Sequence, residues 1–213
     1  MVNFCAFLYN KTWIGEYSKL IIAVANQKGG VGKTTTSINT AACMAERGKK
    51  VLLIDADPQG NATTGLGIDK RQVEHSLYDV LINGLPAQDA VVPTETEGLF
   101  LIPSNIDLAG AEIELVSVMA RETILRRALV SVKKHYDYII IDAPPSLGLV
   151  TLNALSAADS ILVPIQCEYY AMEGLSQLVN TISLVKRNLN KKLEIEGVVL
   201  TMYDGRTNLS TQV

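Results

Sequence analysis

The sequence has little cysteine, few aromatic residues, no excess of basic charge and no long apolar run. Its three cysteines, Cys5, Cys43 and Cys167, lie far apart and form no C-x-x-C pair, which argues against a disulfide framework or a zinc site. That pattern is typical of a reducing, cytoplasmic setting. No apolar run approaches the roughly 18 residues that cross a bilayer, so we expect no stable membrane association.

The charge balance also restricts the class of function. Lys and Arg number 19 against 22 Asp and Glu, which gives a formal net charge of −3. This argues against a surface coated in basic charge for nucleic acid, although it leaves room for a local basic patch. The hydrophobic content of 48% allows a sizeable core and excludes a disordered chain.

Short apolar runs alternate with helical patterns along the chain. The runs lack polar alternation, as expected for strands buried on both faces, and cover residues 20–26, 51–56, 138–142, 160–164 and 195–202, with a shorter strand near 99–103. Apolar residues at helical spacing occur over 38–45, 124–132 and 175–189, and another helix is expected from about Ala111. This alternation predicts an α/β fold with a mostly parallel sheet and helices on both faces.

The first nineteen residues differ from the rest. They include Trp13 and several other aromatic residues but show no convincing period. We therefore assign residues 1–19 to an N-terminal extension of unknown order, and residues 20–213 to a single domain.

A glycine-rich stretch with the sequence KGGVGKTT, residues 28–35, lies between the first predicted strand and a helix. Glycines let backbone N–H groups curve around phosphate oxygens, and the following helix N-terminus adds partial positive charge. Lys33 can reach the β- and γ-phosphates, and the Thr34 hydroxyl can bind Mg²⁺. The usual pattern has a glycine where this chain has Gln27, and Lys28 is an additional lysine. A merely structural glycine turn is the alternative.

Carboxylates follow two of the predicted strands. Asp142 ends the strand YIIID, where the carboxyl edge of the sheet meets the glycine-rich loop, so it is the candidate Mg²⁺ carboxylate. Asp55 and Asp57 follow the second strand and reach the same edge, where a carboxylate can orient or activate an attacking water. For either one, capping the turn before Pro58 is an alternative role.

Together these residues resemble the ParA/Soj chromosome- and plasmid-partitioning ATPases, a branch of the deviant Walker A (MinD-type) P-loop ATPases, with chromosomal Soj-type proteins the nearest in pattern. The resemblance covers about Leu20 to Val213. It is carried by the motifs NQKGGVGKTTT (26–36), DADPQGNATTGLG (55–67), LAGAEIEL (108–115), YDYIIIDAPPSLG (136–148), PIQCEYYAMEGLSQL (164–178) and LTMYDGRTNL (200–209).

The resemblance implies roles for individual residues. Lys33 would hold the ATP phosphates, Thr34 and Asp142 would bind Mg²⁺, and Asp57 would position the hydrolytic water. Lys28 matches the family's signature lysine, which reaches the partner's ATP in a sandwich dimer and couples hydrolysis to dimerisation. The rest of the phosphate-binding loop comprises Gly29, where bulk should block close dimer contact, Gly30, Val31, Gly32 and Thr35.

The resemblance also implies cofactors, partners and location. We expect ATP and Mg²⁺, an ATP-bound homodimer, binding to duplex DNA of the nucleoid without sequence preference, and hydrolysis stimulated by a centromere-binding ParB-type protein. The location would be cytoplasmic and nucleoid-associated. Arg206 matches an arginine implicated in DNA contact; from the residues alone it is a solvated loop charge.

Two departures from the family pattern and two other functions are also considered. The lead-in of nineteen residues is longer than usual, and the chain ends at Val213 before the family's final strand and helices, so we expect a C-terminally truncated domain. The alternatives are a MinD-like membrane-associated positioning ATPase and an ATP-dependent metabolic ligase on the same fold. An inactive binding module is a further possibility.

Overall fold

The computed structural model describes residues 20–167 and 171–203. The extension 1–19 and Arg206 therefore lie outside the described residues. Within them, the strands are β1 (Leu20–Val24), β2 (Val51–Asp55), β3 (Val92–Pro93), β4 (Leu99–Ile102), β5 (Tyr138–Asp142), β6 (Ser160–Gln166) and β7 (Glu194–Thr201). The α-helices are α1 (Lys33–Glu46), α2 (Asn61–Gly65), α3 (Leu77–Leu81), α4 (Leu108–Glu114), α5 (Ile124–Val132), α6 (Leu149–Ala157) and α7 (Ala171–Asn188). Short 3₁₀ helices cover Ala87–Ala90, Leu115–Ser117, Arg121–Thr123 and Lys133–His135.

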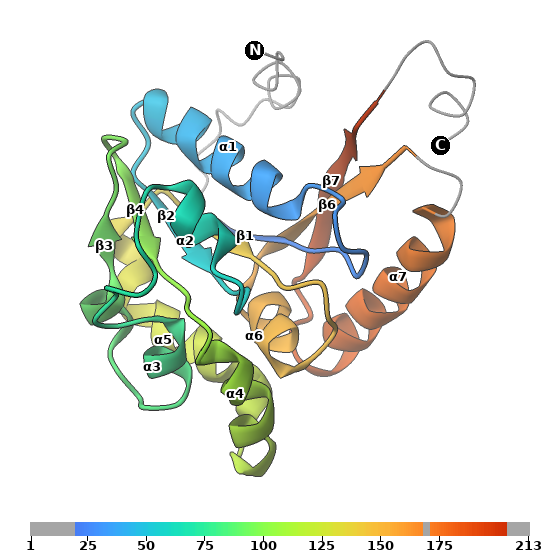
Figure 1. Cartoon of the computed structure of the whole chain (residues 1–213). Helices are drawn as coiled ribbons and strands as arrows, with labels where there is room; N and C mark the ends of the chain where they lie inside the picture. The colour runs from blue at the N-terminus through green and yellow to red at the C-terminus, as the bar shows by residue number, and fades with distance from the viewer. Residues whose placement is uncertain (1–19, 168–170, 204–213) are drawn as a thin grey trace.

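The described strands form one seven-stranded sheet in the order β3-β4-β2-β5-β1-β6-β7 (Figure 1). Every neighbouring pair is parallel except β3 with β4. In the register of the central strands, Asp142 lies opposite both Val24 and Asp55. Strands β1, β2 and β5 therefore end level with one another, and the loops that follow them begin side by side at one edge.

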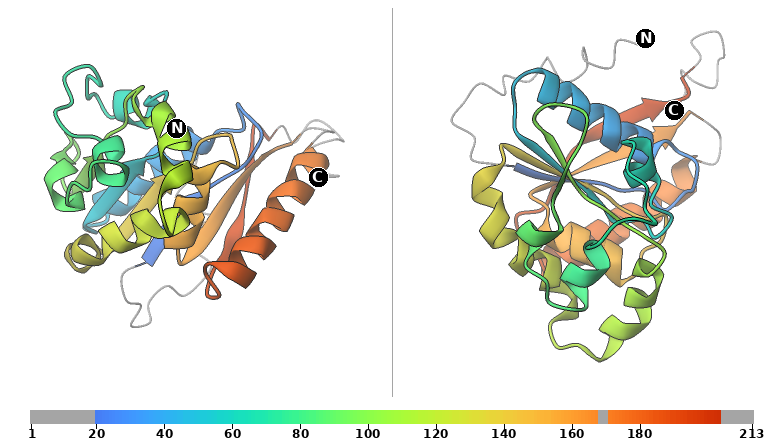
Figure 2. Two further views of the ribbon diagram at one scale, coloured as in Figure 1. Left: turned by 90° about the horizontal axis from the view of Figure 1, so that it is seen from below. Right: turned by 60° about the vertical axis from the view of Figure 1, so that its left-hand side comes forward.

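Helices cover both faces of the sheet, as predicted. Alternate residues of β1 point to opposite sides: Ile21 and Ala23 belong to one apolar cluster, and Ile22 and Val24 to the other. The smaller cluster packs under α1 and α2, while α3 to α7 cover the opposite face with the larger cluster (Figures 1 and 2). Burial on both faces explains why the strands read as continuous apolar runs.

The predicted elements are confirmed with small shifts at their ends. The first strand ends at Val24 rather than Asn26, and the predicted helix near Ala111 begins at Leu108. Helix α6 was not predicted. Seven of its nine residues are buried, so it carries no polar stripe from which helical periodicity could be recognised.

Candidate functional site

The glycine-rich loop joins β1 to α1 at the carboxyl edge of the sheet. Gly30 and Gly32 have φ angles of +74° and +83°, in the left-handed region that favours glycine. Gly32 immediately precedes α1, and its carbonyl accepts the N–H of Thr36 at 2.9 Å. No side chain caps the N-terminus of α1. The first-turn N–H groups are thus left for a ligand, which is the arrangement that binds phosphate oxygens.

Lys33, the first residue of α1, is buried under this loop. This residue is only 7% exposed, and its Nζ donates to the Lys28 carbonyl at 3.1 Å. Burial lowers the pKa of Lys33, while the charges of Asp142 and Asp57 act in the opposite direction. Lys33 therefore lies within electrostatic reach of Asp142, which ends β5, and of Asp57, which follows β2, so these three predicted residues come together.

Asp142 is buried at the end of β5 and is 1% exposed. Its Oδ1 accepts a hydrogen bond from Ser37 Oγ of α1 at 2.8 Å. Its Oδ2 has no hydrogen-bond partner among the described residues. Burial raises the pKa of Asp142 to about 7, against the opposing effect of the Ser37 and Thr34 hydroxyls, and the nearby Asp55 and Asp57 raise it further.

This carboxylate fits a magnesium ion. An unpaired buried oxygen beside a threonine hydroxyl supplies hard oxygen ligands, and Mg²⁺ in phosphate sites takes one or two such protein groups with substrate phosphates and water. No group of three or more His, Cys, Asp or Glu side chains arranged to hold a metal occurs within 20–167 and 171–203.

The structure distinguishes the roles of Asp55, the last residue of β2, and Asp57, which follows that strand. Asp55 is completely buried, and its Oδ2 accepts both the N–H and the hydroxyl of Thr63 at 2.7 Å, while its Oδ1 accepts the Asp57 N–H at 3.2 Å. Burial raises the pKa of Asp55. Asp55 therefore organises the turn. Asp57 is half-buried, and its Oδ1 accepts the Gln59 N–H at 2.9 Å.

The mouth of the loop contains Lys28. Its N–H donates to Asn26 Oδ1 at 3.0 Å, and Asn26 Nδ2 donates to the Pro164 carbonyl of β6 at 2.7 Å. This pair of bonds fixes the start of the loop against the sheet. Lys28 is partly exposed, and the neighbouring Gly29 and Gly30 are exposed.

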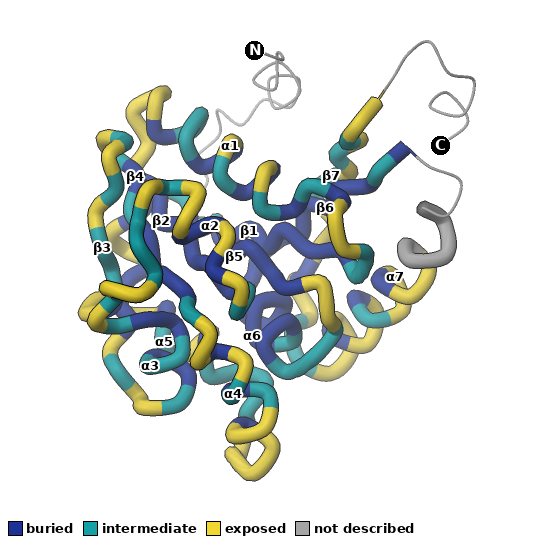
Figure 3. Tube along the Cα trace, viewed as in Figure 1, coloured by how far each residue is buried: buried dark blue, intermediate teal, exposed yellow. Residues whose placement is uncertain are grey.

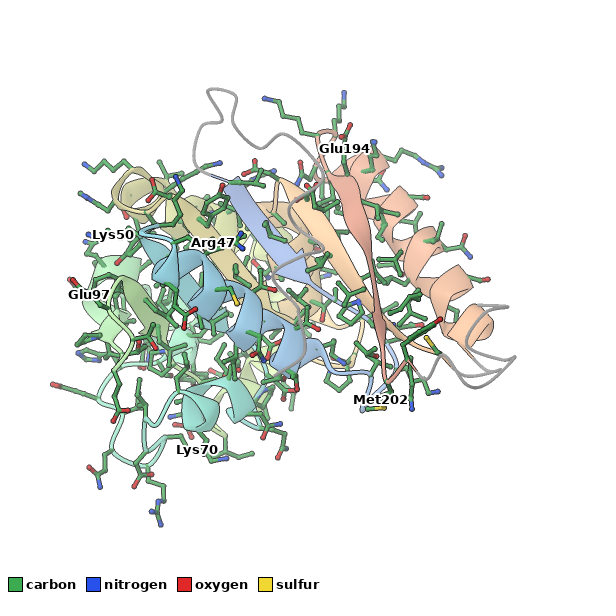
Figure 4. The ribbon with its side chains drawn as sticks, turned by 90° about the horizontal axis from the view of Figure 1, so that it is seen from above. Arg47, Lys50, Lys70, Glu97, Glu194 and Met202 are labelled. Atoms are coloured by element: carbon green, nitrogen blue, oxygen red, sulfur yellow. The ribbon has the colours of Figure 1, made fainter. Side chains whose placement is uncertain are left out.

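Sequence reasoning missed Thr201, the last residue of β7. Its hydroxyl donates to the Val31 carbonyl at 2.9 Å, and its side chain would contact a Cβ placed on Gly32 at 3.4 Å. Figure 4 shows the next residue, Met202, at the end of β7 beside the loop that leads into α1. The edge strand thus supports the glycine-rich loop. Its sequence signals were its position at the end of an apolar run and its place in the motif LTMYDGRTNL (200–209), and neither indicated a role in the loop.

Comparison with known proteins identifies the family. A family model described as an AAA domain matches residues 19–195. The sporulation initiation inhibitor protein Soj of Bacillus subtilis (strain 168) is 62% identical over 193 residues, which cover 91% of this chain and 76% of that protein. This chain belongs to the ParA/Soj family of partitioning ATPases. The chromosome partitioning protein ParA of Myxococcus xanthus (strain DK1622) is 56% identical over 193 residues, 91% of this chain and 68% of that protein.

Solved structures agree with the ParA/Soj assignment at the level of fold. Cobyrinic acid a,c-diamide synthase of Mycobacterium smegmatis, with bound ADP and magnesium, has a TM-score of 0.88 and 45% identity, and the match covers 91% of this chain and 79% of that one. The prediction of a P-loop α/β fold is confirmed. Among the helices that the structure describes, none has the length and apolar character needed to cross a membrane.

Proposed function

We propose that this ParA/Soj family ATPase is an ATP-driven switch for chromosome or plasmid partitioning. It would dimerise when ATP is bound, bind duplex DNA without sequence preference, and hydrolyse ATP faster when a ParB-type partner engages it. It would act in the cytoplasm at the nucleoid. The 62% identity to Soj supports this proposal, as does the 56% identity to a chromosome partitioning ParA.

The observation that carries the proposal is the convergence of Lys33, Asp142 and Asp57 at one edge of the sheet. In our proposal Lys33 and the loop N–H groups hold the ATP phosphates. Thr34 and Asp142 would hold Mg²⁺, which supplies positive charge against the β- and γ-phosphates when it is bound. Asp57 would accept a hydrogen bond from the attacking water and orient it.

The proposed dimer depends on the mouth of the loop. Gly29 is exposed there and carries no side chain, which would let a second subunit approach closely, and a Cβ built on it meets no atom within 4 Å in the single chain. Lys28 would then place its ammonium on the ATP of the second subunit, where it would stabilise negative charge in the transition state. Arg206 would contribute to the DNA contact.

The test is ATP turnover of the chain alone, with duplex DNA of arbitrary sequence, and with DNA plus the cognate ParB-type protein. We expect stimulation that needs both and that disappears in Lys28→Ala, with a loss of roughly tenfold or more because a transition-state cation is removed. The matched control is Lys49→Ala, which removes an exposed lysine just before β2, at the opposite edge of the sheet.

A second candidate is an ATP-dependent ligase on the same fold, favoured by the structural similarity to the diamide synthase. A ligase would consume ATP in proportion to a carboxylic acid substrate and would ignore DNA. Turnover that is indifferent to DNA and to the ParB-type protein, and unchanged in Lys28→Ala, would exclude the partitioning switch and favour this candidate.

A further inference from the structure

Helix α4 is connected to both loops that carry the candidate carboxylates. Just before α4, the Ser104 N–H donates to Thr63 Oγ1 at 3.0 Å, and Thr63 in turn donates to Asp55 at the start of the Asp57 loop. Later in α4, Glu112 contacts the start of α6, which follows the loop after Asp142. At the end of α4 Ile113 and Glu114 are exposed, and so are Val116 and Ser117 in the 3₁₀ turn after it, whereas Leu115 is buried (Figure 3).

Glu112 caps a helix to which it does not belong. Its Oε2 accepts the Leu149 N–H at 2.7 Å, and its Oε1 accepts the Val150 N–H at 3.1 Å. These are the first two residues of α6, and Gly148 before them provides no side-chain cap. A carboxylate at a helix N-terminus satisfies free N–H groups and complements the helix dipole. Because Glu112 comes from α4, this cap also joins two elements.

The position of Gly148 shows how closely the Glu112 carboxylate approaches the backbone just before α6. A Cβ built on Gly148 would overlap both carboxylate oxygens of Glu112. The backbone of Gly148 has φ −77° and ψ −169°, which any residue can adopt. A side chain at this position would therefore force the Glu112 carboxylate to move away from α6, whereas the backbone conformation itself does not require glycine.

We propose that Glu112 is a positioning residue for ATP hydrolysis, an inference that rests on the proposed function. The segment 143–148 begins directly after Asp142, and Glu112 holds the two residues that follow it. Glu112 thereby limits how far this segment can move beside the site. The same bonds make α4 follow the segment. A shift of Asp142 and of the segment 143–148 when ATP binds would therefore also move α4.

The central test is a double-mutant cycle on turnover. Glu112→Ala and Gly148→Ala should each lower kcat by about tenfold, because each removes the same cap, while the KM for ATP changes less than twofold. The double variant should be no worse than either single one, since the added methyl group then meets no carboxylate. Glu112→Gln, which keeps one acceptor oxygen, should recover part of kcat. Glu114→Ala, on the same helix, is the control, because within the described part of the chain its carboxylate accepts only from the Tyr78 hydroxyl.

Hydrogen exchange supplies a readout that does not need turnover. In the parent chain, adding ATP and Mg²⁺ should slow amide exchange in both 143–150 and 108–114. In Glu112→Gln, whose single remaining acceptor should still keep α6 folded, the change in 143–150 should persist and the change in 108–114 should shrink by severalfold.

The outcomes separate this inference from the proposed function. Additive effects of Glu112→Ala and Gly148→Ala on kcat would overturn the inference, and so would an α4 that exchanges identically with and without nucleotide in the parent chain. Turnover that ignores DNA and the ParB-type protein, with the non-additive cycle intact, would overturn the partitioning switch and leave the role of Glu112 standing. If the chain shows no turnover at all, the hydrogen-exchange comparison alone decides whether Glu112 couples α4 to the site.

Discussion

Asp142 illustrates at the scale of one residue how this site is assembled at a cost in stability. A carboxylate that is 1% exposed, with one oxygen unpaired among the described residues, is an unfavourable group in a folded core. Its pKa is raised to about 7, chiefly by burial. Such groups persist where function uses them, and in our proposal Asp142 binds Mg²⁺.

This burial predicts a specific pH dependence for Asp142→Asn. In an unfolded chain an aspartate loses its proton near pH 4, whereas folded Asp142 keeps its proton to about pH 7. The folded state therefore binds more protons between these values, and the parent protein loses stability as pH rises through that window. Asparagine does not titrate, so its advantage over aspartate should grow from pH 5 to pH 8 by on the order of 3 kcal/mol.

The measurement is chemical unfolding of both proteins without Mg²⁺ or nucleotide across that pH range. The same variant should lose Mg²⁺-dependent ATP turnover. Parallel stability profiles for Asp142→Asn and the parent would contradict the argument, since they would mean that Asp142 ionises in the folded protein at its ordinary pKa.

The residues also show where sequence reasoning reached its limit. It predicted that Asp55 and Asp57 share one edge with the glycine-rich loop, because both follow a buried strand. It did not separate their roles, because the distinction depends on Thr63, which donates twice to Asp55. Thr63 reaches Asp55 only because α2 begins at Asn61 and turns the chain back. The contact between Glu112 and α6 could not be predicted either, since it joins residues 37 and 38 positions apart in the sequence.

At the scale of whole elements, apolar runs predicted the strands well but gave no information about the polar contacts that the strands make with the site. Strand β7 was expected from its apolar residues, yet its contribution to the site is a polar side chain at its last position. Thr201 holds the Val31 carbonyl, and that carbonyl belongs to the loop that would contact phosphate. Helix α6 was missed for the opposite reason, because its burial on almost every side removes the periodic pattern.

The role of β7 predicts the effect of Thr201→Val. Valine keeps the shape of threonine but leaves the Val31 carbonyl without its donor, so ATP affinity should fall about fivefold, which corresponds to about 1 kcal/mol. Thr201→Ser, which keeps the hydroxyl, should bind ATP nearly as well as the parent. Thr181→Val is the matched control, because the Thr181 hydroxyl donates within α7, to the Gln177 carbonyl. Equal affinities for Thr201→Val and Thr201→Ser, measured by calorimetry, would count against a role for the hydroxyl.

At the scale of the whole molecule, the site lies where the three central strands end together. Strands β1, β2 and β5 are the middle of the described sheet, and α1 packs over them on one face. A ligand held there contacts the most buried part of the fold. Its binding should therefore oppose global unfolding, and not only the opening of a peripheral loop.

The corresponding prediction is a large thermal shift with ATP and Mg²⁺. A ligand present at one hundred times its Kd stabilises the folded state by about 2.7 kcal/mol, which for a chain of this size raises Tm by roughly 5–10 °C. Lys33→Ala should abolish most of this shift, because it removes the buried cation beneath the loop, whereas Lys49→Ala should retain it. The shift is compared within each variant, since removing a buried lysine changes the Tm of the free protein as well.

With EDTA in place of Mg²⁺, the shift of the parent chain should be much smaller, because the Asp142 carboxylate then faces the phosphates without a cation between them. A full shift in Lys33→Ala would place the nucleotide elsewhere on the molecule.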